Sequence, residues 1–137
     1  MRRRRLAALV ALAAVIAAGL LVHKGLPGST ATDVAGDALY AVAAFTGLVL
    51  LFPRAPRFAL AGAAALWCVG VELLQLTGVP LALAERVPPV ALLLGTGFDA
   101  RDLVVYVCAV AVAVAVDIAV SRLLPRGTAR TGVGAPG

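Results

Sequence analysis

Three acidic residues lie in or beside long apolar segments of this chain, and each has a polar partner one helical turn further along. The pairs are Asp37 with Tyr40, Glu72 with Gln75, and Asp102 with Tyr106. Charged side chains at membrane depth are costly, face protein or a wet cavity, and indicate a functional site by default. The three carboxylates are candidates for acid–base catalysis or for holding a cation. The amide and the two phenols are candidates for binding a polar ligand.

Each of these residues also has a structural explanation. Asp102 and Asp37 lie close to expected helix starts, where an N-cap or the helix dipole favours a carboxylate. Tyrosines are common at the membrane interface, which is the alternative for Tyr40 and Tyr106. Glu72 lies inside its apolar segment and is the strongest functional candidate, with a hydrogen-bonded structural role as its alternative.

The composition places the chain among integral membrane proteins. Of its 137 residues, 62% are hydrophobic and 14% are charged, with a mean hydropathy of +1.02. A soluble domain of this size needs a polar shell that this composition cannot supply. The net charge is +5, but the basic residues flank apolar segments. They therefore indicate membrane topology and contacts to anionic lipid, and no nucleic-acid partner is expected.

Four apolar segments are long enough to cross a bilayer, which takes about 20 helical residues. They cover residues 6–22, 34–52, 58–76 and 103–124. The sequence thus predicts an all-α, four-helix transmembrane bundle as a single domain over residues 1–124. Residues 125–137 are expected to form a disordered cytoplasmic tail. The short apolar stretch 90–94 follows two prolines and predicts a re-entrant or interfacial segment before the last helix.

The distribution of basic residues predicts the orientation. If the N-terminus lies in the cytoplasm, the inner side carries nine basic residues and the outer side carries three, which are Lys24, Arg86 and Arg101. Both termini are therefore predicted to be cytoplasmic, and all three acidic pairs then lie toward the outer face. The first segment also resembles a signal peptide after its arginine run, so its cleavage stays open as an alternative.

Four other residues, one arginine, one aspartate and two cysteines, carry side chains that could belong to a site. Arg86, in the outer loop, is the predicted binding residue for a phosphate or carboxylate, because a guanidinium pairs with both. Asp117 lies in the cytoplasmic half of the last segment and is expected to pair with a neighbouring helix or to reach the interface. Cys68 and Cys108 are expected to be packing residues. No cysteine–histidine cluster has metal-site spacing, so neither a metal nor another cofactor is expected.

The motifs resemble those of a known family. The stretches 36–40, 71–75, 92–98 and 102–106 carry Asp-x-x-Tyr, Glu-x-x-Gln, Gly-x-Gly-Phe and Asp-x-x-x-Tyr. In this order they resemble the domain-of-unknown-function 2809 family of small bacterial membrane proteins, over about residues 6–122. The same skeleton is similar to the VanZ-like family, which is linked to glycopeptide and lipopeptide resistance. In VanZ-like proteins the final aspartate is typically followed by an asparagine and glycines, whereas here Tyr106 lies four residues after Asp102. The resemblance implies a shared fold and a multi-pass protein of the bacterial inner membrane, but no reaction.

Three functions follow from these observations. The first is an envelope protein whose outward-facing pocket binds an anionic or glycosylated lipid headgroup, such as that of a lipid-linked envelope precursor. The second is a non-enzymatic structural or accessory subunit whose polar layer holds the helices together, as a homo-oligomer or with a membrane partner. The third is a small transporter or proton relay that uses Glu72 and Asp117. Whether the protein is an enzyme is not decided by its sequence.

Overall fold

A computed structural model describes residues 2–123, and it is helical throughout apart from short connections. The helices are α1 (Arg2–Gly25), α2 (Thr30–Leu51), α3 (Arg57–Gln75), α4 (Val79–Arg86), α5 (Val90–Leu94) and α6 (Ala100–Leu123). The all-α prediction is confirmed, since no strand occurs among residues 2–123. Helices α1, α2, α3 and α6 are long and apolar enough to cross a membrane. The predicted end of the last segment at residue 124 and the predicted tail lie outside the described residues.

The helix boundaries follow local signals. Helix α2 begins earlier than its apolar segment because Ser29 caps it, with the Ser29 hydroxyl and the Thr32 side chain each bonding the other's backbone N–H. Such a capping box satisfies donors that a helix start otherwise leaves unpaired. Helix α3 begins directly after Pro56, and proline is tolerated at a helix start because the first N–H groups have no partner.

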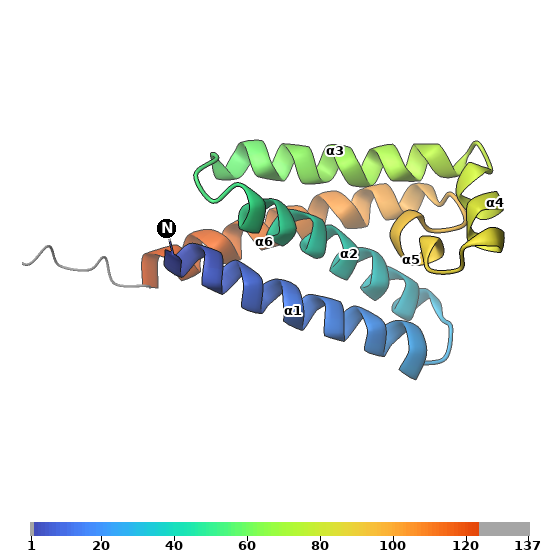
Figure 1. Cartoon of the computed structure of the whole chain (residues 1–137), viewed down its shortest axis with the longest axis horizontal. Coiled ribbons are helices and arrows are strands. Elements are labelled where there is room, and N and C mark those ends of the chain that lie inside the picture. Colours follow the sequence, from blue (N-terminus) through green and yellow to red (C-terminus); the bar gives the residue numbers. More distant parts are fainter. Residues whose placement is uncertain (1, 124–137) are drawn as a thin grey trace, which may run out of the picture.

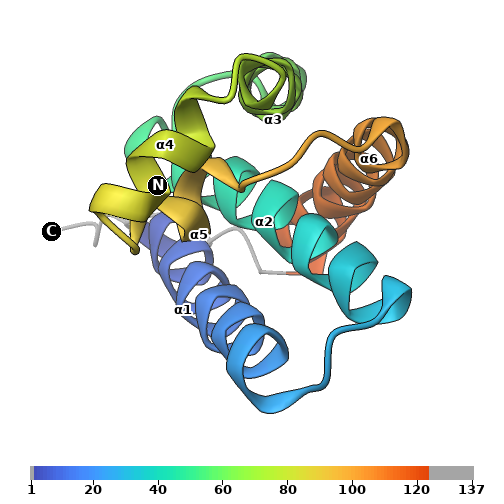
Figure 2. The same cartoon turned by 90° about the vertical axis from the view of Figure 1, so that its right-hand side faces the viewer.

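Helix α2 is the centre of the bundle, and α1, α3 and α6 pack around it (Figures 1 and 2). The start of α1, the α2–α3 connection and the end of α6 lie at one end of the molecule (Figure 1). The α1–α2 connection, α4 and α5 lie at the other end. Both ends of the described chain are thus on one side, as the topology requires. That this side is cytoplasmic stays a prediction.

The packing is that of a membrane protein. The buried core is built largely from small and branched side chains, with Phe45 as its largest apolar member: Ala41, Phe45, Val49, Ala64 and Cys68. Small residues allow close approach of helix backbones, which drives association where lipid removes the hydrophobic effect. Large apolar side chains point outward instead, and Phe58 is 76% exposed and Leu66 73% exposed. The outer surface of the bundle is therefore suited to lipid.

Helices α4 and α5 do not span the bundle but fold across its end (Figure 2). The predicted short segment 90–94 forms a separate short helix, α5, and its re-entrant or interfacial position stays a prediction. Helix α4 was not expected from the sequence. Gly78 has a φ of 73° and turns the chain between α3 and α4, a conformation that glycine adopts without steric cost. Pro80 lies in the first turn of α4, where its fixed φ favours a helix start.

Asp117 joins three helices at the end of the bundle where α1 begins and α6 ends. Its Oδ2 lies 3.1 Å from Arg4 Nη2 and 2.6 Å from Arg57 Nε. Arg4 Nη1 also donates to the Pro53 carbonyl oxygen at 2.8 Å. This ion-pair cluster, which we call the Asp117 clamp (Arg4, Arg57 and Asp117), explains the acidic residue in α6. It also makes α1 an integral part of the folded bundle.

Candidate functional site

Four predicted site residues bond to each other, to the end of α5 or to the segment that connects α5 with α6. Tyr40 from α2 and Glu72 and Gln75 from α3 bond to the backbone of residues 93–99, and Tyr106 from α6 bonds to Glu72. We call this group the latch (Tyr40, Glu72, Gln75 and Tyr106). The i,i+3 spacing of Glu72 and Gln75 puts both on the same face of α3, as expected.

Glu72 is fully buried and both of its oxygens accept hydrogen bonds. The backbone N–H of Asp99 donates to Oε1 at 2.6 Å, and the Tyr106 hydroxyl donates to Oε2 at 3.2 Å. A buried carboxylate is tolerated when donors satisfy it in this way. Glu72 therefore fixes the start of α6 relative to α3, and this contact favours its structural alternative.

Tyr40 and Gln75 bind the end of α5. The Tyr40 hydroxyl donates to the Leu93 carbonyl oxygen at 2.8 Å and accepts from Trp67 Nε1 at 2.8 Å. Gln75 Nε2 donates to the Leu94 carbonyl oxygen at 2.8 Å. The last carbonyl groups of a helix have no partner within it, so these bonds satisfy them. Trp67 was not selected from the sequence, although its spacing of five residues from Glu72 placed it near the same layer.

The latch leaves no room for a side chain at position 95, which is a glycine. It has a φ of 63° and a ψ of −173°, and a Cβ at this position would collide with the Gln75 amide. Only glycine adopts this backbone region readily, and other residues there cost about 1–3 kcal/mol. The second glycine of the motif, Gly97, has open space around it and no positive φ.

We therefore expect Gly95→Ala to lower the free energy of unfolding by about 2 kcal/mol, from backbone strain and displacement of Gln75. Gly97→Ala is the matched control and should change it by less than about 0.5 kcal/mol. Unfolding of both variants in mixed detergent micelles measures the difference. Equal losses in the two variants would show that Gly95 has no special role.

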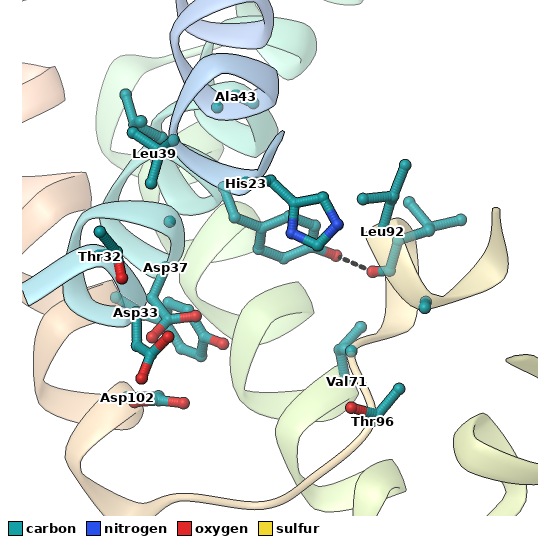
Figure 3. A pocket seen from close by; sticks show the side chains of 18 of the residues that line it. His23, Thr32, Asp33, Asp37, Leu39, Ala43, Val71, Leu92, Thr96 and Asp102 are labelled. Atoms are coloured by element: carbon teal, nitrogen blue, oxygen red, sulfur yellow. Dashed lines mark hydrogen bonds between the residues drawn. The ribbon is translucent and has the colours of Figure 1, made fainter. Parts of the chain in front are cut away.

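An open cleft of about 900 Å³ lies beside the latch, between the second half of α1, the first half of α2, α5 and the start of α6 (Figure 3). Its α1 wall is apolar and includes Val15, Ile16, Gly19 and Leu20. Its polar lining comes mainly from α2 and from residues 99–106. The polar lining residues are Thr32, Asp33, Asp37, Tyr40, Gln75, Thr96, Asp99, Arg101, Asp102 and Tyr106, together with His23 near the end of α1. The cleft thus has one apolar and one polar side.

The start of α6 supplies a compact charged group to this cleft. Asp99 Oδ1 accepts the backbone N–H of Arg101 at 2.9 Å, so the side-chain cap of α6 is Asp99 rather than Asp102. Arg101 Nη2 lies 3.2 Å from Asp99 Oδ2 and 3.5 Å from Asp102 Oδ1. Asp102 is only 8% exposed, and Asp33 and Asp37 lie close to it on one side of the cleft (Figure 3).

The structure brings together five of the seven predicted site residues. The cleft is lined by Asp37, Tyr40, Gln75, Asp102 and Tyr106. Glu72 is buried behind this lining and takes part in the latch instead. Arg86 ends α4 as an exposed residue and is not among the lining residues, so Arg101 is the arginine of the cleft. The position of Arg101 next to Asp102, at the start of an apolar segment, was the signal available for it.

No group of three or more histidine, cysteine, aspartate or glutamate side chains within residues 2–123 is arranged to hold a metal ion. Cys68 is buried and Cys108 is exposed on α6, and both are free thiols. The lining of the cleft offers carboxylates, phenols, an amide and a guanidinium, which can form hydrogen bonds and ion pairs with a ligand.

A family model described as "Protein of unknown function (DUF2809)" matches residues 28–110. The matched range contains every residue of the latch and the polar lining of the cleft from α2 onward. No curated protein and no solved structure matches the chain.

Proposed function

The chain belongs to the DUF2809 family, whose function is unknown, and we propose that its cleft binds the hydroxyl-rich, glycosylated headgroup of a membrane lipid. The supporting observation is the two-sided lining of the cleft. Apolar residues of α1 face carboxylates and phenols of α2 and α6 across about 900 Å³. Ligand pockets of small molecules are commonly about 300–1,000 Å³, mostly apolar with a few oriented polar groups.

The charges of the lining favour a glycosylated over an anionic headgroup. Four carboxylates line the cleft, namely Asp33, Asp37, Asp99 and Asp102, against the single guanidinium of Arg101. Arg101 is already paired with two of them. The excess of acceptors repels phosphate and accepts hydrogen bonds from sugar hydroxyls. Arg86, the residue that supported an anionic ligand, is outside the cleft.

The α1 wall supports a lipid as the carrier of this headgroup. Leu20 is 42% exposed and Ile16 50% exposed, so the wall continues into the surface that faces the acyl chains. A lipid-linked envelope precursor combines an apolar tail with sugars and is the ligand class that we propose. The setting that we propose is the outer leaflet of a bacterial inner membrane, which rests on the charge asymmetry of the connections.

The test is mass spectrometry of the lipids that co-purify with the protein in mild detergent. A glycosylated lipid is expected to be enriched, and Asp37→Asn should reduce its recovery about fivefold, as loss of one hydrogen bond costs about 1 kcal/mol. Glu85→Gln is the matched control, because Glu85 is an exposed carboxylate on α4 outside the cleft. It should leave the recovery unchanged.

A second variant tests the cleft without altering its charges. Gly19 lines the apolar wall and has open space around it, so Gly19→Leu should fill the cleft without disturbing the core. It should reduce lipid recovery as strongly as Asp37→Asn. Enrichment of anionic phospholipid in place of glycosylated lipid, or recovery that neither variant changes, would refute the proposal.

The latch favours the structural function for four of the predicted residues. Tyr40, Glu72, Gln75 and Tyr106 are engaged by one another, Trp67 and the backbone of residues 93–99. In this proposal they hold α5 and the start of α6 in place and thereby shape the cleft. The proton-relay function has no comparable support, because Asp117 is paired with Arg4 and Arg57 at the opposite end of the bundle from Glu72.

A further inference from the structure

A second cleft lies at the end of the bundle where α1 begins and α6 ends, between the start of α1 and the end of α2. It has a volume of about 620 Å³ and is lined by Arg3, Arg5, Leu6, Leu9 and Leu50. Two guanidinium groups and three leucines therefore meet in one place, and no carboxylate is among these lining residues. The second cleft is therefore lined by positive charges, whereas carboxylates predominate in the first cleft.

Neighbouring arginines of α1 have different partners. Arg4 belongs to the Asp117 clamp, and its charge is compensated there. Arg5 turns toward α2 instead, where its Nε donates to the Leu50 carbonyl oxygen at 3.2 Å. That bond satisfies a carbonyl group in the last turn of α2 and holds the Arg5 guanidinium at the mouth of the cleft.

Apart from the two arginines, the second cleft is lined by leucines. Leu6 is 62% exposed and Leu9 50% exposed, so the leucine surface continues from the guanidinium groups into the membrane-spanning part of α1. Arginine forks bind phosphate through several hydrogen bonds. Basic pockets between transmembrane helices on the cytoplasmic side are suited to phosphorylated lipid headgroups.

We infer that this second cleft binds an anionic phospholipid, with the phosphate on Arg3 and Arg5 and an acyl chain along Leu6, Leu9 and Leu50. A free phosphate would engage the arginines alone and leave the leucine surface uncovered. The apolar lining therefore identifies the ligand as a lipid. The site is independent of the glycosylated-lipid proposal, since the two clefts share no residue.

The test is native mass spectrometry of the full chain in detergent with added phosphatidylglycerol or phosphatidylcholine of the same acyl chains. Phosphatidylglycerol should bind more tightly. Each basic residue near the headgroup contributes about fivefold to the affinity for an anionic lipid. Arg3→Gln combined with Arg5→Gln should therefore weaken the binding of phosphatidylglycerol about thirtyfold. Phosphatidylcholine binding should change little. Replacing both arginines by lysine should restore most of the preference, because the charge returns.

The matched control is Arg54→Gln combined with Arg122→Gln, which removes the same charge at the same end but outside the cleft. This control variant should change the affinity for phosphatidylglycerol by less than about twofold. Leu6→Asn combined with Leu9→Asn retains both arginines and should weaken lipid binding without affecting the weak binding of glycerol phosphate. Equal losses in the two arginine pairs, or full competition by glycerol phosphate, would overturn the inference.

Discussion

Replacing Glu72 by alanine is expected to lower the free energy of unfolding by about 4 kcal/mol, the largest effect of any single change considered for this protein. The substitution leaves two buried donors, the Asp99 N–H and the Tyr106 hydroxyl, without their acceptor. Each unsatisfied buried group costs about 1–3 kcal/mol. The removed side chain also leaves a cavity, because Glu72 is completely enclosed.

The measurement is reversible unfolding of the purified protein in mixed micelles of a mild detergent and dodecyl sulfate. Glu72→Gln should lower the free energy of unfolding by less, about 1–2 kcal/mol. The amide oxygen can accept one of the two hydrogen bonds, but the amide NH₂ group would face the second donor. Glu85→Ala, on the exposed face of α4, is the control and should be nearly neutral. If Glu72→Gln is as stable as the parent and loses only the co-purifying lipid, Glu72 is a ligand-binding residue and not part of the latch.

Asp117→Ala is expected to lower the free energy of unfolding by about 3 kcal/mol, because it leaves Arg4 and Arg57 close together without the carboxylate between them. This loss is at the lower end of the range of about 3–5 kcal/mol for buried pairs, since the Arg57 side chain is 34% exposed. The loss should be reduced when Arg57 is also replaced by glutamine, and the double-mutant cycle should give a coupling of about 1–2 kcal/mol.

Arg54→Gln is the matched control for this cycle. Arg54 lies in the α2–α3 connection, three residues before Arg57, but is not part of the Asp117 clamp. It should show no coupling with Asp117. Coupling of equal size at both arginines would mean that Asp117 responds to the general positive charge of this end rather than to the bonds described.

The spans could be predicted from the sequence because the bilayer dictates their length. Any apolar helix that crosses it needs about 20 residues, so composition alone identifies four segments. The short helix α5 was also predictable, since Pro88 and Pro89 precede it and Gly95 ends it. Helix α4 was missed, because eight residues give too little periodicity to distinguish a helix from the end of the preceding span.

The candidate site was predictable in part for a similar reason. Helical spacing and depth in the membrane determine that Asp37, Tyr40 and Tyr106 face a common region. Spacing does not determine what fills that region. The path of residues 95–99 brings the Asp99 N–H onto Glu72 and places Arg101, not Arg86, at the cleft. Such contacts depend on the course of a connection, which has no repeating pattern.

The Asp117 clamp has a consequence for the biogenesis of the chain. Arg4 and its carboxylate partner are 113 residues apart, and Arg57 is 60 residues away from that partner. During synthesis, both arginines are therefore made before the carboxylate that pairs with them. Translation of α6 supplies this carboxylate, so the Asp117 clamp forms only when the last helix is present. A chain truncated before α6 would leave Arg4 and Arg57 without this partner.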